Sequence, residues 1–174
     1  MFNRVNPWKI VLDHFSTLRQ FNANSKRISL SDSIVFILIP LMLSAVLVFN
    51  GFSIRPYIGY LISCVAVFGG FLFNLLAIIY SVIDKISKDA IDEKNELKKL
   101  FAREIHINIS YCILLSILLT ITLILHTISI RPGTINVLAK NIVLTSTYFL
   151  LINFFLTLMM VLNRIYILLK KESE

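Results

Sequence analysis

The chain has 174 residues, of which 57% are hydrophobic and only 16% are charged, and its mean hydropathy is +0.81. A soluble globular domain carries about 25% charged residues, so this composition excludes an ordinary soluble protein. The formal net charge is +7. In so hydrophobic a chain, an excess of Lys and Arg favours contact with anionic membrane lipids. We expect no direct binding of nucleic acid.

The N-terminal segment, residues 1–32, begins with signals for a helix. Asn6 is a suitable N-cap and Pro7 suits the first helical position. Apolar residues then recur on one helical face, at Trp8, Val11, Leu12, Phe15 and Leu18. This pattern predicts an amphipathic helix at the cytoplasmic membrane surface, with Trp8 and Phe15 as interfacial or gating residues. A simple interfacial anchor fits the same pattern.

Four stretches contain no charged residue: 33–54, 56–83, 105–130 and 141–163, with 22, 28, 26 and 23 residues. About 20 residues of helix cross the hydrocarbon core of a bilayer. The first stretch is no signal peptide, because 32 residues precede it and no small-residue cleavage pattern follows it. We therefore predict an all-α, polytopic membrane protein with four transmembrane helices and an N-terminal amphipathic helix.

The expected divisions are the segment 1–32, a first transmembrane hairpin at 33–83, a charged helical loop at 84–104, a second hairpin at 105–168 and a tail at 169–174. Fourteen Lys and Arg residues fall before the first span, in the loop or after the last span, against three in the two other loops. Cytoplasmic loops carry the basic excess. We expect a multi-pass protein of the bacterial inner (cytoplasmic) membrane with both termini cytoplasmic.

Small and polar residues mark one face of the second span. They recur at intervals of four and seven and fall within a narrow arc at 100° per residue, and the line continues to Lys88 beyond the membrane. These residues are Gly59, Ser63, Gly70, Asn74 and Ser81. The fourth span adds Thr145, Asn153 and Thr157. Such faces either permit close helix packing or line a hydrated path. We assign these eight residues to pore lining or helix packing, and Lys88 to gating.

The remaining loops carry less specific signals. Residues 84–104 contain six acidic and six basic residues and predict helical extensions that could dock a partner. The tetrapeptide Ser-Ile-Arg-Pro occurs at 53–56 and again at 129–132. The two copies follow the first and third predicted spans, which is the pattern of two related hairpins or of convergent loop chemistry.

No cluster of residues predicts catalysis. His14, His106 and His126 lack metal-ligand spacing, and no phosphate-binding loop or nucleophile motif occurs. The predicted spans contain no carboxylate or Lys for a proton relay. We expect neither an enzyme nor a bound cofactor or metal. The amount of uncharged polarity instead favours a homo-oligomer with a hydrated centre.

The plan of an amphipathic helix at 7–21, four spans and a charged loop at 84–104 resembles the membrane subunits of bacterial anti-phage defence systems, such as the KwaA protein of Kiwa and the HalB protein of Hailong. That resemblance implies a tetrameric, channel-like assembly with a cytoplasmic defence protein as partner. Two other hypotheses fit the residues. The chain is similar in plan to immunity proteins against pore-forming colicins, and it could also be a non-conducting anchor for a soluble partner.

Overall fold

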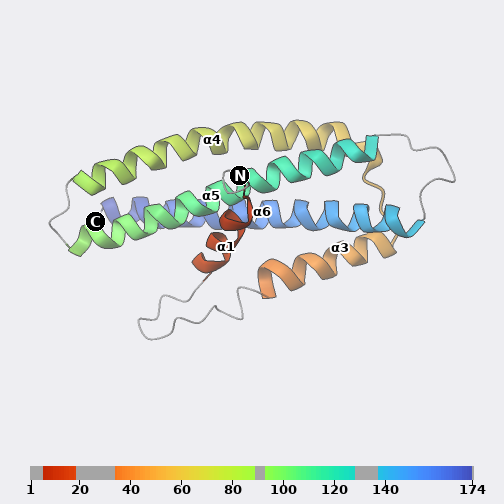
Figure 1. The fold of residues 1–174 in the computed structure, drawn as a ribbon, viewed down its shortest axis with the longest axis horizontal. Coiled ribbons are helices and arrows are strands. Elements are labelled where there is room, and N and C mark those ends of the chain that lie inside the picture. The colour runs from red at the N-terminus through yellow and green to blue at the C-terminus, as the bar shows by residue number, and fades with distance from the viewer. Residues whose placement is uncertain (1–5, 19–33, 89–92, 128–136, 174) are drawn as a thin grey trace.

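The computed structural model describes residues 6–18, 34–88, 93–127 and 137–173, with side chains except at 86–88, 93–97, 137–138 and 171–173. Every regular element in these ranges is helical, which confirms the predicted all-α class (Figure 1). The elements are α1 (Trp8–Thr17), a π-helical turn (Ile34–Leu38), α3 (Ile39–Phe49), a 3-10 turn (Arg55–Tyr57), α4 (Ile58–Lys88), α5 (Glu93–Thr127) and α6 (Val137–Ser173). The second Ser-Ile-Arg-Pro copy lies outside the described residues.

Three of the described helical segments are long and apolar enough to cross a membrane. They are Arg55–Lys85, Lys98–Thr127 and Ala139–Lys170, with mean hydropathies of 2.4, 2.3 and 1.9. The helices therefore suit a transmembrane protein, as predicted. The first predicted span, 33–54, contains a shorter apolar helical segment, Ile34–Phe49, instead of a helix of full spanning length.

Local sequence explains the shape of that shorter segment. Pro40 has no N–H to donate to a preceding helical carbonyl, and a π-helical turn comes just before it. At the other end, Gly51 adopts a φ of 72°, in the region that favours glycine. Its N–H donates to the Val48 carbonyl at 3.0 Å, and the Phe52 N–H donates to the Leu47 carbonyl at 3.1 Å. This Schellman arrangement ends α3 and turns the chain towards α4.

Helix α5 is the centre of the bundle, with α4 packed along it on one side and α6 on another (Figure 1). Half of its apolar window is buried, against 17% for α4 and 22% for α6. Buried residues recur every seven positions, as in helices that pack like coiled coils. The series are Ile58, Val65, Leu72 and Ile79 on α4; Ile105, Cys112 and Leu119 on α5; and Thr147, Phe154, Val161 and Leu168 on α6. Helix α4 therefore leaves a broad exposed face, and α6 leaves a narrower one.

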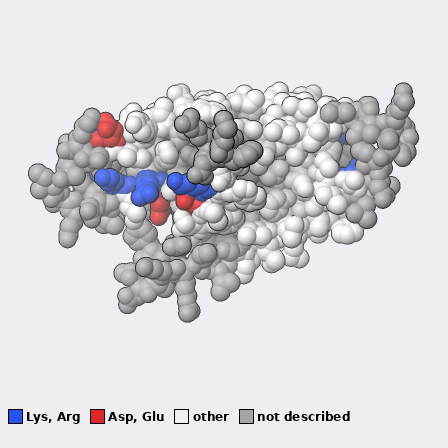
Figure 2. Space-filling view, viewed as in Figure 1, with Lys and Arg blue, Asp and Glu red and all other residues white. Residues whose placement is uncertain are grey.

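The two ends of the bundle differ in charge. We call the end where α4 and α6 begin the Arg55 end and the opposite end, where α4 stops and α5 begins, the Arg164 end. Figure 2 shows Lys, Arg, Asp and Glu gathered over the half nearer the Arg164 end, whereas the other half is a broad uncharged surface with a small basic patch close to its tip. Short helices lie beside the long ones: α3 runs along α6 towards the Arg55 end, and α1 packs on α5.

Candidate functional site

The predicted small and polar face of α4 lies on the outside of the bundle. Its five residues, Gly59, Ser63, Gly70, Asn74 and Ser81, are all exposed. At 100° per residue they lie about 160–170° from the buried seam that packs on α5. A Cβ added at Gly59 or Gly70 would meet no heavy atom within 4 Å, whereas one at Gly69 would meet the Ser116 hydroxyl at 3.6 Å. None of the five residues is thus used to hold the chain's own helices together.

The polar groups of this face differ in how they are satisfied. The Ser63 hydroxyl donates to the Gly59 carbonyl at 3.0 Å, and the Ser81 hydroxyl donates to the Ala77 carbonyl at 3.1 Å. Each bond stays within α4, which is a common way for hydroxyls to be satisfied in apolar helices. The Asn74 side-chain amide has no hydrogen-bond partner among the described residues. An amide on a span surface needs a partner from another chain or from water.

The fourth-span residues grouped with that face lie elsewhere. Asn153 and Thr157 are buried within the single chain. The Asn153 amide donates to the Phe149 carbonyl at 3.0 Å, and the Thr157 hydroxyl donates to the Asn153 carbonyl at 2.8 Å. The structure therefore places these two in intramolecular packing, apart from the α4 face. Thr145 lies in a third location, a groove between α3 and α6.

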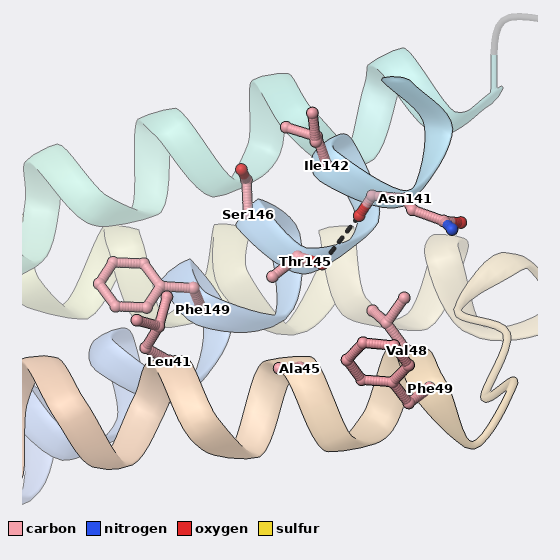
Figure 3. Close-up of a pocket in the computed structure, with 9 residues that line it drawn as sticks. All are labelled: Leu41, Ala45, Val48, Phe49, Asn141, Ile142, Thr145, Ser146 and Phe149. Carbon is pink, nitrogen blue, oxygen red and sulfur yellow. Dashed lines mark hydrogen bonds between the residues drawn. The ribbon is translucent and has the colours of Figure 1, made fainter. Parts of the chain in front are cut away.

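That groove has a volume of about 580 Å³ and opens on the bundle surface (Figure 3). Its α3 wall is apolar, and its α6 wall combines two aliphatic or aromatic residues with three polar ones. The lining residues are Leu41, Ala45, Val48, Phe49, Asn141, Ile142, Thr145, Ser146 and Phe149. The Thr145 hydroxyl donates to the Asn141 carbonyl at 2.8 Å. No charged side chain and no thiol lines the groove. The lining therefore suits contact with lipid better than catalysis.

Helix α1 begins one residue later than predicted: Pro7 is its N-cap rather than its first residue, and the Asn6 Oδ1 accepts a hydrogen bond of 3.1 Å from the Trp8 N–H. Its orientation differs from the predicted single apolar face. Trp8 and Leu12 are exposed, at 70% and 68%, and Phe15 is half-buried. The helix instead packs on the bundle through a flank that contains His14, Thr17 and Leu18, all buried. One flank thus contacts protein, and Trp8 remains available to the membrane surface.

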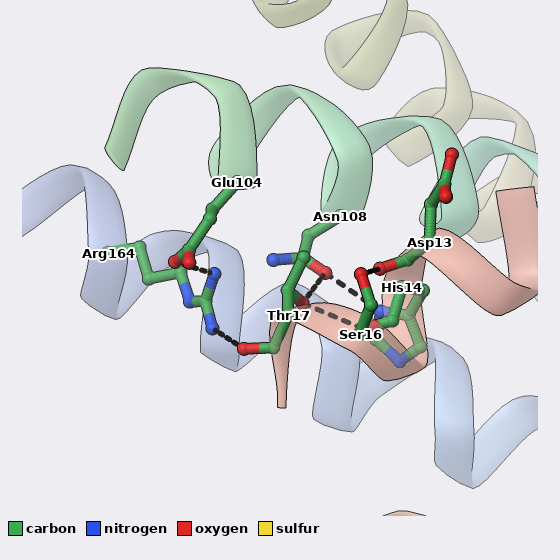
Figure 4. Close-up of polar contacts among 7 residues, drawn as sticks. All are labelled: Asp13, His14, Ser16, Thr17, Glu104, Asn108 and Arg164. Carbon is green, nitrogen blue, oxygen red and sulfur yellow. Dashed lines mark hydrogen bonds and ion pairs between the residues drawn. The ribbon is translucent and has the colours of Figure 1, made fainter. Parts of the chain in front are cut away.

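A polar cluster holds this flank of α1 against α5 (Figure 4). The His14 Nδ1 lies 2.8 Å from the Asn108 Oδ1, and the Thr17 hydroxyl lies 3.0 Å from the same oxygen. The His14 ring also stacks on Tyr111, with centroids 3.8 Å apart and an interplanar angle of 11°. His14 and Asn108 are fully buried. Sequence positions more than 90 residues apart are therefore joined in one contact.

Helix α6 completes the cluster through Arg164. Its Nη1 donates to the Glu104 Oε2 at 2.7 Å, and its Nη2 donates to the Thr17 carbonyl at 2.9 Å. Both charged side chains are largely buried, at 16% and 21% exposure. The carbonyls in the last turn of a helix lack intrahelical donors and carry partial negative charge, so a guanidinium there stabilises the helix end. We call the contacts of His14 and Thr17 with Asn108, Tyr111 and Arg164, together with the ion pair between Arg164 and Glu104, the α1 clamp.

Burial holds His14 neutral. Because Nδ1 faces an acceptor oxygen, Nδ1 carries the proton and Nε2 is the bare nitrogen. No described residue forms a hydrogen bond with Nε2. Protonation would place a second N–H among aromatic rings, with Phe15 and Phe36 edge-on to the imidazole. Desolvation, opposed by the Asn108 hydrogen bond and assisted by the positive charge of Arg164, lowers the pKa of His14 to about 4.

The sequence analysis missed most of the α1 clamp. His14 was considered only as an isolated histidine, and Glu104 only as part of a charged loop. Asn108 could have indicated a polar contact between helices, because it is the first side-chain amide inside the uncharged stretch 105–130. The remaining predicted gating residue, Lys88, ends α4, but its side chain lies outside the described residues.

Within the described residues, no group of three or more His, Cys, Asp or Glu side chains could hold a metal ion. The chain matches no protein-family model, and no curated protein or solved structure matches it. The structure thus defines a class, an all-helical protein with helices suited to a membrane. The two sites that bear on its function are the exposed face of α4 and the α1 clamp.

Proposed function

We propose that this chain is a four-span membrane protein that assembles with copies of itself through the exposed face of α4, forming a channel-like oligomer controlled by α1. The observation that carries the proposal is the placement of that face. Four small or hydroxyl-bearing positions and the Asn74 amide, which has no partner among the described residues, lie opposite the seam that packs on α5. Another copy can therefore approach α4 without disturbing the fold of the first chain.

The fourth crossing in this proposal is the segment containing α3. The 16 helical residues of Ile34–Phe49 span roughly 24 Å at about 1.5 Å per residue, and the uncharged stretch 33–54 supplies additional length. With four crossings, the basic residues of 1–32, 84–104 and the tail all lie on one side. The excess of Lys and Arg there favours the cytoplasmic side of an inner membrane.

The α1 clamp supports a control role for the N-terminal helix. It joins α1 to α5 through His14, Thr17 and Asn108 and to α6 through Arg164 and the Thr17 carbonyl, at distances of 2.8–3.0 Å. Contacts of this kind have two discrete states, formed or broken, which a simple hydrophobic anchor lacks. Undocking of α1 would free the Arg164 ends of α5 and α6 to move.

Assembly is tested by cysteine cross-linking after Cys64 and Cys112 are replaced with alanine. Gly70→Cys on the α4 face should cross-link to a second copy in native membranes. Met159→Cys is the control, because it is exposed on α6 at a comparable distance along its span. Equal cross-linking of both positions, or none at Gly70→Cys, would contradict assembly through α4.

Conduction is tested by ion flux in proteoliposomes. Asn74→Leu and Ser63→Leu should abolish the current while the cross-linked oligomer still forms, because these positions supply polarity and the glycines supply close approach. Met159→Leu serves as the control. Unchanged currents in both polar variants would reject the pore and leave the non-conducting alternatives, an anchor or a colicin immunity protein.

The proposed setting is bacterial anti-phage defence with a cytoplasmic partner, on the strength of the architectural resemblance alone. Cells that carry the gene and its neighbours should show reduced phage plating, and Asn74→Leu should restore plating. If the protein conducts ions but phage plating is unaffected, the channel hypothesis is kept and the defence hypothesis is rejected. Protection against a pore-forming colicin would instead favour the immunity hypothesis.

A further inference from the structure

A cavity separate from the α3 and α6 groove lies at the Arg55 end. It has a volume of about 280 Å³, well above the roughly 10–15 Å³ that one water occupies. Residues from the turn before α4, the last turn of α5 and the first two turns of α6 form its walls. They are Ser53, Ile54, Arg55, His126, Lys140 and Leu144. Three helix ends that are distant in sequence therefore meet around one space.

The side chains around this cavity have a single sign of charge. Arg55 and Lys140 are the charged side chains of its lining, and neither forms an ion pair with a described residue. The chain has no Asp or Glu between 33 and 83 or between 105 and 171. The described segments at this end thus contain no carboxylate that could neutralise the cavity.

The backbone and the hydroxyl groups add to the positive potential. Helices α4 and α6 both begin at this end, and helix amino ends carry unsatisfied N–H groups and partial positive charge. The imidazole of His126 is fixed by a contact of 3.1 Å between its Nε2 and the Thr147 Oγ1, whose hydroxyl donates to the Val143 carbonyl at 2.9 Å. Because that hydroxyl proton is already used, the His126 Nε2–H must be the donor in their contact.

We propose that this cavity binds a phosphate group. The Arg55 guanidinium and the Ser53 hydroxyl from the turn before α4 and the Lys140 ammonium from α6 present donors, and guanidinium binds phosphate oxygens in bidentate geometry. Ile54 and Leu144 give the cavity an apolar wall at the end of apolar helices, where lipid headgroups lie. The phosphate can belong to an anionic lipid headgroup or to free inorganic phosphate. The inference is independent of oligomerisation and conduction.

Binding is measured on the full chain in detergent, by native mass spectrometry and by thermal shift. The probes are phosphatidylglycerol, phosphatidylcholine with the same acyl chains, and inorganic phosphate at constant ionic strength. Arg55→Gln and Lys140→Gln should each weaken phosphate binding about tenfold or more, because each removes a charge-assisted hydrogen bond. Lys85→Gln, an exposed basic position at the opposite end, is the matched control.

Loss of binding in Arg55→Gln and Lys140→Gln with retention in Lys85→Gln supports the site. Preference for phosphatidylglycerol then assigns a lipid headgroup, whereas equal retention of inorganic phosphate assigns a free anion. Absence of binding by every probe, or equal weakening in all three variants, overturns the proposal. If Arg55→Gln fails to fold because it disturbs the start of α4, the exposed Lys140 decides the outcome.

Discussion

The α1 clamp and the α4 face use polar residues in opposite ways. In the clamp, Asn108 is buried and bonded to two residues of another helix. On the α4 face, Asn74 is exposed on a spanning helix and has no partner among the described residues. The same amide therefore stabilises the single chain at one site and is left for an external partner at the other. Whether a polar residue stabilises the single chain or is left for assembly thus depends on its location more than on its type.

The largest expected effect is the loss of Arg164. Arg164→Met leaves the largely buried Glu104 carboxylate without its cation and the Thr17 carbonyl without its donor. Removing one partner of a buried pair costs roughly 3–5 kcal/mol. Thermal unfolding in detergent should show a strong loss of stability. The control Lys85→Met should be nearly neutral, since Lys85 is exposed; equal effects would mean that the clamp is not a stabilising contact.

The next effect is the pH dependence of α1 docking. Docking lowers the pKa of His14 from 6.5 to about 4, so the undocked form binds more protons. Docking is fully favoured above pH 6.5 and weakens as the pH falls towards 4, by about 3 kcal/mol in total. The fluorescence anisotropy of Trp8, the single tryptophan, reports α1 mobility. His14→Phe should keep the ring contact with Tyr111 and flatten this pH profile; an unchanged profile would exclude His14 as its source.

A direct test of the comparison is to replace both amides. Asn108→Leu should destabilise the single chain by about 1–3 kcal/mol, because His14 and Thr17 lose a buried partner. Asn74→Leu should leave the stability of the isolated chain almost unchanged, since no described contact is lost. Unfolding of detergent-solubilised monomers measures both. If Asn74→Leu is as costly as Asn108→Leu, the α4 face is part of the fold.

The smallest expected effect compares two adjacent glycines. Gly70→Ala adds a methyl group to the exposed face and should reduce cross-linking between copies, although the single chain has open space there. Gly69→Ala places its methyl at ordinary contact distance from the Ser116 hydroxyl, at 3.6 Å, and should leave cross-linking unchanged. If Gly69→Ala reduces cross-linking and Gly70→Ala does not, the interface lies on the α5-facing side of α4 instead.

The packed side of α4 has a periodic pattern in the sequence. The seven-residue series at Ile58, Val65, Leu72 and Ile79 is visible in the sequence. It was not recognised because nearly every neighbouring position in a span is also apolar, so the hydrophobic pattern does not identify the packed side. The polar residues were more informative: their narrow arc on α4 was predicted, and the structure places that arc on the exposed side.

Composition and the segregation of charge by themselves determined an all-helical chain with long apolar helices, because a backbone in lipid must satisfy its own hydrogen bonds. Local signals at Asn6 and Pro7 also placed the start of α1 to within one residue. Only the tertiary structure decided that Asn153 and Thr157 pack inward while Asn74 faces outward, that His14 meets Asn108 and that Thr17 meets Arg164. Those outcomes depend on the rotation and crossing of helices distant in sequence, which side-chain packing sets and residue spacing within one helix does not.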